Sequence, residues 1–270
     1  MKLHILGTAA SEGYPALFCT CPHCQKARQL GGKNIRTRTS AIIDDTIKID
    51  FPPDTLHHVL RDNLDLTKIQ HLLFTHTHHD HFYPEDLNMR LPGYAHGVTY
   101  PLHIYGNGAA LANLSKSLKK QNGHVQFHLL RPFSTYQIGD AEVTPLLADH
   151  NQIETCLLFH IKKGNTSLLY GHDTGWFPDE TWTWLETNAK IDIALLDCTN
   201  GNLPEYRNHM NVNAVIDTKN RLQKNRLLSD QSKVYVTHFS HNIGLLHEDL
   251  IKIFQPYDID VAYDGLMIER

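Results

Sequence analysis

The stretch Thr75-His76-Thr77-His78-His79-Asp80-His81 follows directly after an apolar, strand-like run and places four strong metal ligands within six residues. Side chains alternate along an extended segment, so His76 and His78 project to the same side. A turn after them would bring Asp80 and His81 back from the other direction. Imidazole suits zinc, iron and manganese, and a carboxylate among histidines suits a harder, more open ion. The stretch therefore predicts a metal centre at the end of a strand.

This H-x-H-x-D-H loop after a hydrophobic strand resembles the metallo-β-lactamase superfamily, whose hydrolases use it to hold a dinuclear site. The resemblance implies three further ligands downstream, and the sequence offers each of them at the end of an apolar run. The implied ligand set is His76, His78 and His150 on one metal, Asp80, His81 and His238 on the other, and Asp173 bridging both. Ligands at strand ends are expected, because a rigid sheet positions reactive groups at its edge.

A second metal signal lies in Cys19-Thr20-Cys21-Pro22-His23-Cys24, which places three thiols within six residues. Thiolates this close cannot readily form an unstrained disulfide with one another, but they can converge on one ion. Three cysteines need a fourth ligand to close a tetrahedron, and His241 is the candidate, with His23 as the local competitor. A closed site of this kind has no open position for a substrate. The sequence therefore predicts a structural zinc beside the dinuclear metal site.

Four more stretches narrow the resemblance: Gly7-Thr8-Ala9-Ala10-Ser11-Glu12-Gly13-Tyr14-Pro15, Asp197-Cys198, Arg207-Asn208-His209 and Thr237-His238-Phe239-Ser240-His241. Together with the cysteines and the histidine loop, they look like the PhnP-type phosphodiesterases, from Gly7 to about residue 265. The resemblance implies a structural zinc with His241 as its fourth ligand and a dinuclear site that works well with manganese. It also implies activity on cyclic phosphodiesters such as a ribose 1,2-cyclic phosphate, and a role for His209 as an active-site histidine that binds no metal.

Two segments depart from the family pattern. Ile49-Asp50-Phe51-Pro52-Pro53 stands where the family often has Ile-Asp-Ala-Gly, and Gly171-His172-Asp173 replaces a more usual Ser-Asp. We still expect Asp50 to orient metal-bound histidines from behind, as outer carboxylates do. His172 could reach that same outer layer, and His79, on the opposite phase of the loop, is expected to point outward. The altered loops leave the substrate open.

The chemistry expected of such a centre follows from charge. Two metals about 3.5 to 4 Å apart can lower the pKa of a bridging water and neutralise charge at phosphorus. Asp80 and His209 are the predicted catalytic residues, with His209 donating a proton to the departing alkoxide or a hydrogen bond to the phosphoryl oxygens. The cofactors expected are two divalent ions of manganese or zinc, with iron also compatible, and one structural zinc.

Composition agrees with one enzyme domain over residues 1–270, since 41% hydrophobic content in this length can bury a large core. The net charge of −4 argues against a protein built to neutralise nucleic acid, whereas a small anionic phosphodiester remains a suitable substrate. No signal peptide or membrane span is expected, and five cysteines with three assigned to metal suit a reducing cytoplasm. The resemblance also suggests a homodimer.

Hydrophobic periodicity predicts strands and helices in alternation. The expected strands are 2–6, 41–50, 69–74, 102–105, 125–130, 142–147, 155–161, 167–170, 191–197, 233–237 and 260–268. The expected helices are 54–61, 108–120, 179–188, 212–224 and 246–254. This pattern predicts an α/β (α+β) fold, the αββα sandwich of two mixed sheets flanked by helices that the metallo-β-lactamase fold has.

Three other functions stay open at this stage. One is another hydrolase of the superfamily, such as a tRNA 3′-processing nuclease, which the low charge disfavours. Another is a coenzyme-biosynthesis (PqqB-like) protein, where oxidation chemistry could apply. The last is a metal-stabilised scaffold, whose sites would be expected to lack ligands, whereas every position is filled here.

Overall fold

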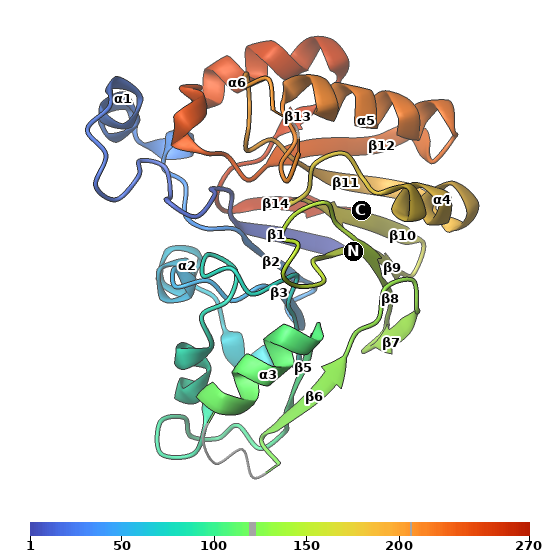
Figure 1. The fold of residues 1–270 in the computed structure, drawn as a ribbon. Helices are drawn as coiled ribbons and strands as arrows, with labels where there is room; N and C mark the ends of the chain where they lie inside the picture. Colours follow the sequence, from blue (N-terminus) through green and yellow to red (C-terminus); the bar gives the residue numbers. More distant parts are fainter. Residues whose placement is uncertain (119–122, 206) are drawn as a thin grey trace.

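Two seven-stranded sheets lie face to face at the centre of the molecule, with helices on both outer sides (Figure 1). The first sheet has the order β14 (Leu266–Glu269), β1 (Lys2–Gly7), β2 (Ser40–Ile43), β3 (Ile47–Ile49), β4 (His71–Leu73), β5 (Leu102–Gly106) and β6 (Val125–Leu129). The second has the order β13 (Asp260–Val261), β12 (Leu228–Thr237), β11 (Ile191–Asp197), β10 (Thr166–Gly171), β9 (Leu157–Lys163), β8 (Ala141–Leu147) and β7 (Tyr136–Ile138). This computed structural model describes residues 1–118, 123–205 and 207–270.

Both sheets are mixed. In the first, the pairs from β14 through β3 are antiparallel and those from β3 through β6 are parallel. In the second, β10 to β13 pair in parallel and β7 to β10 pair antiparallel. The predicted αββα sandwich of two mixed sheets is therefore confirmed.

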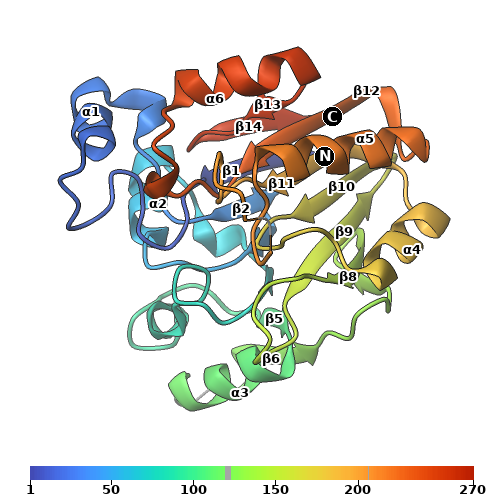
Figure 2. The ribbon, with the colours of Figure 1, turned by 45° about the horizontal axis from the view of Figure 1, so that its top comes forward.

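The helices flank the sheets. They are α1 (Pro22–Leu30), α2 (Thr55–Asp62), α3 (Gly108–Ser117), α4 (Asp179–Asn188), α5 (Val212–Lys224) and α6 (His247–Phe254). Turning the molecule shows α5 and α6 along the outer side of the second sheet, over β11 to β13 (Figure 2). Short 3-10 turns are η1 (Gly32–Asn34), η2 (Leu66–Lys68), η3 (Pro84–Arg90), η4 (His241–Ile243) and η5 (Gln255–Tyr257).

Apolar side chains at every second position of the strands form the core between the sheets. Ile47 and Ile49 of β3 pack there against side chains of the second sheet such as Phe159 and Leu195. The central strand β11 is apolar on both faces, because its other face is covered by a second cluster that includes Trp182 of α4. Burial on both sides fixes the strand ends from which the site is built.

Two predicted strands each divide into two. The span 41–50 is interrupted by a turn in which Asp44 and Asp45 adopt positive φ, so β2 and β3 form a hairpin that periodicity alone did not separate. The span 260–268 contributes β13 to the second sheet and β14 to the first. A chain that crosses between sheets leaves no mark in a hydrophobic pattern.

Other elements were not predicted, namely α1, β7 and the 3-10 turns. The five predicted helices are present within a few residues of their expected bounds. Part of the predicted helix 108–120 lies outside the described residues. No helix in the described part of the chain is long and apolar enough to cross a membrane.

Candidate metal centre

Three histidines from two strand ends form the first ligand group. His76 and His78 follow β4, and His150 follows β8. Their ring nitrogens lie within 4.8 Å of one another, and His150 Nε2 is 3.0 Å from His78 Nδ1. The structure therefore brings together the three side chains expected on one metal.

Asp80, His81 and His238 form the second ligand group, although His238 comes from the end of β12 in the other sheet. His81 Nε2 lies 3.3 Å from Asp80 Oδ2 and 3.3 Å from His238 Nε2. All three side chains are buried. These are the residues expected on the other metal.

Asp173 lies between the two groups, at the end of β10. Its Oδ1 is 3.7 Å from His150 Nε2, whereas its Oδ2 is 3.1 Å from His81 Nε2 and 3.2 Å from His238 Nε2. One carboxylate oxygen thus faces each group. Burial alone would raise the pKa of Asp173, but attraction to His238 and His81 holds that pKa well below its usual range, so the group is an anion.

The outward ring nitrogens are held by the protein. His81 Nδ1 donates to Asp50 Oδ2 at 2.7 Å, so Asp50 lies where it was expected. His150 Nδ1 donates to the carbonyl of Asn208 at 3.0 Å, and His238 Nδ1 donates to Thr199 Oγ1 at 2.7 Å. Such contacts fix the ring and leave its other nitrogen free for an ion.

The site fits divalent metals by its own chemistry. His76 Nε2 is buried and has no hydrogen-bond partner, while Nδ1 of the same ring lies 2.9 Å from Thr75 Oγ1. A buried polar atom without a partner is costly, and an ion among these ligands would remove that cost. Imidazoles with a few carboxylates are the ligands that zinc and manganese accept. Coordination itself stays a prediction.

Backbone strain concentrates at the same place. Asp50, Asp173 and His238 all have positive φ, at 58°, 59° and 61°. Residues other than glycine rarely adopt this conformation, and it persists where the surrounding structure enforces it, commonly at functional sites. Asp173 and His238 belong to the ligand groups themselves, and Asp50 holds His81 from behind.

Asp197 organises the neighbouring side of the centre. This fully buried carboxylate accepts hydrogen bonds from the backbone N–H of Asp173 at 2.9 Å, Thr199 at 2.8 Å and Met210 at 3.1 Å. It also accepts from His209 Nδ1 at 2.9 Å. With its oxygens used in this way, Asp197 serves to position groups around it.

Nδ1 of His209 is engaged by Asp197, so it is not available to a metal. The residue also lines the cavity. Burial would lower the pKa of His209, but attraction to Asp197 and the hydrogen bond between them raise it to about 9. His209 therefore stands as a donor beside both ligand groups, in the place expected for an active-site histidine.

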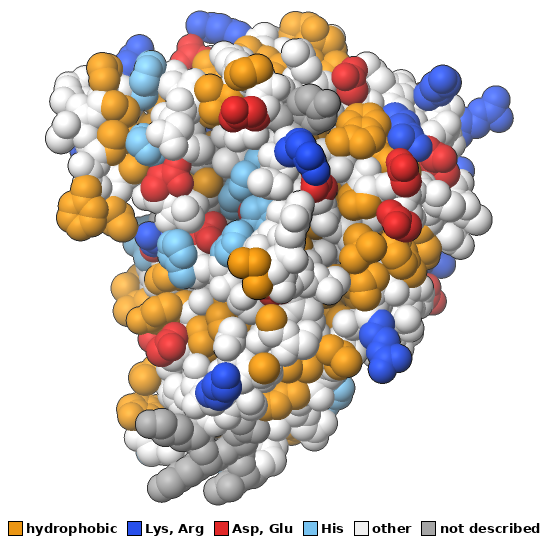
Figure 3. Space-filling model, viewed as in Figure 1, with side chains coloured by type: hydrophobic (Ala, Val, Ile, Leu, Met, Phe, Trp, Pro, Cys, Tyr) orange, Lys and Arg blue, Asp and Glu red, His pale blue; other side chains and the backbone are white. Residues whose placement is uncertain are grey.

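The centre opens into a cavity of about 440 Å³, visible as a hollow where histidines gather (Figure 3). Its wall carries polar, uncharged side chains that include Ser11, Asn200 and Asn242, together with the carboxylate of Glu12. None of its lining residues in the described chain is Lys or Arg. His79 is exposed at the rim, as expected from its phase.

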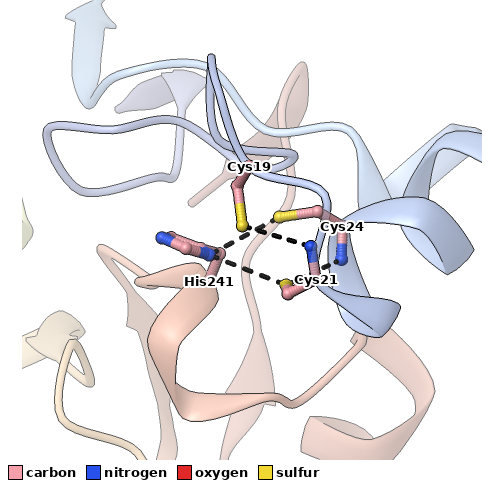
Figure 4. Close-up of side chains that lie close together, drawn as sticks. All are labelled: Cys19, Cys21, Cys24 and His241. Carbon is pink, nitrogen blue, oxygen red and sulfur yellow. Dashed lines mark hydrogen bonds between the residues drawn. The ribbon is translucent and has the colours of Figure 1, made fainter.

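A second cluster joins the amino-terminal loop to the segment after β12. Cys19, Cys21, Cys24 and His241 place their ligand atoms within 4.8 Å of one another, with His241 Nδ1 3.5 Å from Cys24 Sγ (Figure 4). His23 is exposed and lies against Gly244, away from this group. A hydrogen bond from the backbone N–H of Cys24 and, as a smaller effect, one with His241 lower the pKa of the Cys21 thiol to about 6. A lowered pKa favours a thiolate ligand.

Sequence reasoning missed several supporting residues. Asp197 was noted only as part of a resemblance, although its place at the end of a buried strand was a signal. Thr199 and the carbonyl of Asn208 gave none. Glu154 was also missed; it accepts from Thr77 N at 3.0 Å and thereby ties down the histidine loop. His172 Nδ1 lies 2.9 Å from Asp173 Oδ2, in the outer layer expected for it.

Comparison with known proteins gives a family and several relatives. The profile of a family described as "Beta-lactamase superfamily domain" matches residues 47–239. The chain is 23% identical to coenzyme PQQ synthesis protein B of Acinetobacter baumannii (strain AYE), with 100% of each chain covered.

Among solved structures, the fold is similar to that of a diphosphatase from the PhnP family, with a TM-score of 0.76, 24% identity and coverage of 100% of this chain and 97% of that one. It is also similar to Zn(2+)-bound PqqB from Methylobacterium extorquens, with a TM-score of 0.77, 17% identity and 100% of each chain covered. At these identities the structural likeness concerns the fold.

Proposed function

Because this chain belongs to the beta-lactamase superfamily, we propose that it is a metal-dependent hydrolase of a small phosphodiester, cyclic in form, such as a ribose 1,2-cyclic phosphate. The observation that carries the proposal is the position of Asp173, with one carboxylate oxygen toward each of two histidine groups, beside a further histidine, His209, whose Nδ1 is held by Asp197.

The two ligand groups would hold two divalent ions, with Asp173 shared between them. When bound, the ions supply a hydroxide at neutral pH and positive charge for the phosphoryl oxygens. The protein's part is to fix the ligands. Asp50 and Thr199 hold His81 and His238 in one orientation each, so that little reorganisation is needed on substrate binding.

His209 supplies the proton. Since its Nδ1–H is given to Asp197, Nε2 is the nitrogen left to face the cavity, and a protonated ring donates from there to the leaving oxygen. Asp197 stabilises that protonated form by charge. A leaving alkoxide that gains a proton as its bond to phosphorus breaks departs as a neutral alcohol.

The lining of the cavity supports a small substrate with little charge beyond its reacting group. In the described chain, no lysine or arginine lines it, and Glu12 adds a negative charge at its wall. A polyanion such as tRNA is held mainly by cationic side chains. Ser11, Asn200 and Asn242 instead suit the hydroxyl groups of a sugar.

The test compares three substrates with manganese present and after chelation: bis(p-nitrophenyl) phosphate, a cyclic ribose phosphate and a tRNA precursor. We expect turnover of the first two, lost with chelator and restored by metal, and little cleavage of the third. Preferred cleavage of the tRNA precursor would favour a nuclease. No cleavage of any phosphodiester in protein shown to hold its metals would refute the proposal and favour oxidation chemistry of the PqqB kind.

A further inference from the structure

A second cavity, of about 220 Å³, lies on the outer face of the first sheet, under η2 and η3. Its wall is mostly apolar, with Phe51, Leu72 and Leu102 among the side chains that form it. None of its lining residues lines the cavity of the metal centre. It is therefore a separate place on the protein.

Lys48 lines this apolar cavity and is 1% exposed. Its neighbours in β3, Ile47 and Ile49, point into the core between the sheets, so strand alternation places Lys48 on the outer face. Lysine is almost never fully buried unless it is paired. A cation at this position calls for a physical reason.

The partners of Lys48 do not neutralise it. Its Nζ donates a hydrogen bond to Ser40 Oγ and lies 5.5 Å from the centre of the Phe51 ring. In the described residues, no carboxylate lies within ion-pair distance of this ammonium group. Burial lowers the pKa of Lys48 to about 7, although Asp50 acts in the opposite direction.

The other charged groups of the cavity leave it with a positive balance. Arg90 and Asp86 also line it, so the three charged side chains sum to +1 when Lys48 is protonated. The guanidinium of Arg90 is already used for the backbone carbonyls of Tyr100 at 2.7 Å and His124 at 3.1 Å. The ammonium group of Lys48 has three N–H donors and gives one of them to Ser40, so donors remain for an anion.

We propose that this cavity binds a small monocarboxylate with a short apolar body, its carboxylate at Lys48 and its body against Phe51, Leu72 and Leu102. A cavity of about 150 Å³ with apolar walls accepts benzene. The space here is larger, yet smaller than the roughly 300 Å³ at which sites for drug-sized ligands begin. A chain of about six carbons suits that size, at about 0.8 kcal/mol of transfer free energy for each buried methylene.

The binding test uses hexanoate, with hexanol and hexylamine as neutral and cationic analogues, on the metal-loaded protein. The chain has four methionines, so spectra of ¹³C-methyl methionine are simple to assign. Met89 lines the cavity, and Met210 follows His209 beside the metal centre. We expect hexanoate to shift the Met89 methyl signal, to leave that of Met210 in place, and to bind more tightly than hexanol, while hexylamine does not bind.

Three variants separate charge from shape. Lys48→Met should weaken hexanoate binding about tenfold or more, the effect of losing a charged hydrogen bond, and should leave hexanol binding unchanged. Ala95→Phe, which adds a ring at the wall, should abolish binding of both. Lys68→Met is the matched control, because this nearby lysine is exposed and lies outside the cavity, so binding should not change.

Each other result overturns the proposal. If Met210 shifts and Met89 does not, the carboxylate binds at the metal centre. Equal binding of hexanoate to the wild type and to Lys48→Met would mean that the cavity takes apolar molecules without regard to charge. No response of Met89 to hexanoate would remove the site. None of these outcomes depends on which reaction the metal centre catalyses.

Discussion

Several histidines of the centre have a different partner at each ring nitrogen. His81 gives one to Asp50 and turns the other toward Asp173, and His238 does the same with Thr199. Asp197 holds Nδ1 of His209 in the same way, and His209 lines the cavity. At the scale of single residues, a partner behind each of these rings therefore fixes its orientation.

The first prediction concerns the proton donor. His209→Ala should keep its bound metals and lose about 10² to 10⁴ in kcat on a cyclic ribose phosphate, whose alkoxide leaving group needs a proton, the range for a general acid. Metal content and steady-state kinetics measure the two effects. His57→Ala is the control, since this exposed histidine of α2 is outside the centre. Wild-type turnover in His209→Ala would remove His209 from the mechanism.

The second prediction concerns the shared carboxylate. Asp173→Asn keeps the shape but removes the charge that faces both groups. We expect it to bind fewer metal ions per chain at the active site and to lose most activity, while the cysteine cluster keeps its zinc. Elemental analysis after dialysis measures this, and full stoichiometry in the variant would show that Asp173 bridges nothing.

At the scale of elements, the segment after β12 connects both centres. It carries His238 into the metal centre and, three residues later, His241 into the cysteine cluster at the start of η4. Cys21 is the N-cap of α1 and accepts from Cys24 N at 3.4 Å. Between the two centres, Glu12 accepts a hydrogen bond from Ser240 and also lines the catalytic cavity.

The third prediction follows from that connection. Cys21→Ser should lose the structural zinc and lower the Tm. It should also weaken activity through the contact between Glu12 and Ser240, while the ligands of the metal centre remain in place. Zinc content after mild chelation and thermal melts measure this. Cys156→Ala, at a buried cysteine outside the cluster, should keep its zinc. An unchanged Tm together with full loss of zinc would mean that the cluster does not stabilise the fold.

At the scale of the molecule, two sheets with apolar inner faces account for most of the burial, and charged groups inside them are few. Lys48 is also buried, but on the outer face of the first sheet. The groups around it are Ser40, which accepts its hydrogen bond, the Phe51 ring at 5.5 Å, Asp50 directly after the same strand, and Asp86 and Arg90, which line the same cavity. His58 of α2, nearby, is neutral, because burial lowers its pKa to about 2.

The fourth prediction is a pH dependence of stability. The pKa of Lys48 falls from 10.5 to about 7 on folding, so between those values the unfolded chain binds the extra proton. Stability should therefore rise with pH across this window, by up to about 1.4 kcal/mol per pH unit from this group alone. Chemical denaturation at pH 7 and pH 10 measures it. Lys48→Met should lack this increment, and equal pH dependence in both proteins would contradict the assignment.

Much of the site could be predicted from local sequence. The H-x-H-x-D-H loop and the three clustered thiols are ligand sets within six residues each, and short stretches need no tertiary information to indicate metal chemistry. Periodicity also located five of the six α-helices in the described chain and most strands, because one apolar face per element follows from burial. The downstream ligands His150, Asp173 and His238 came from resemblance to a family.

Only the tertiary structure decided which residues from distant stretches come together. It grouped His241 and not His23 with the thiols, because the segment after β12 brings His241 to them while His23 lies exposed against Gly244. It placed Asp197 beneath His209, divided 260–268 between two sheets and enclosed Lys48 in an apolar cavity. A sequence shows which side chains are present and the local period of the apolar ones. Contacts between distant strand ends depend instead on how the two sheets pack.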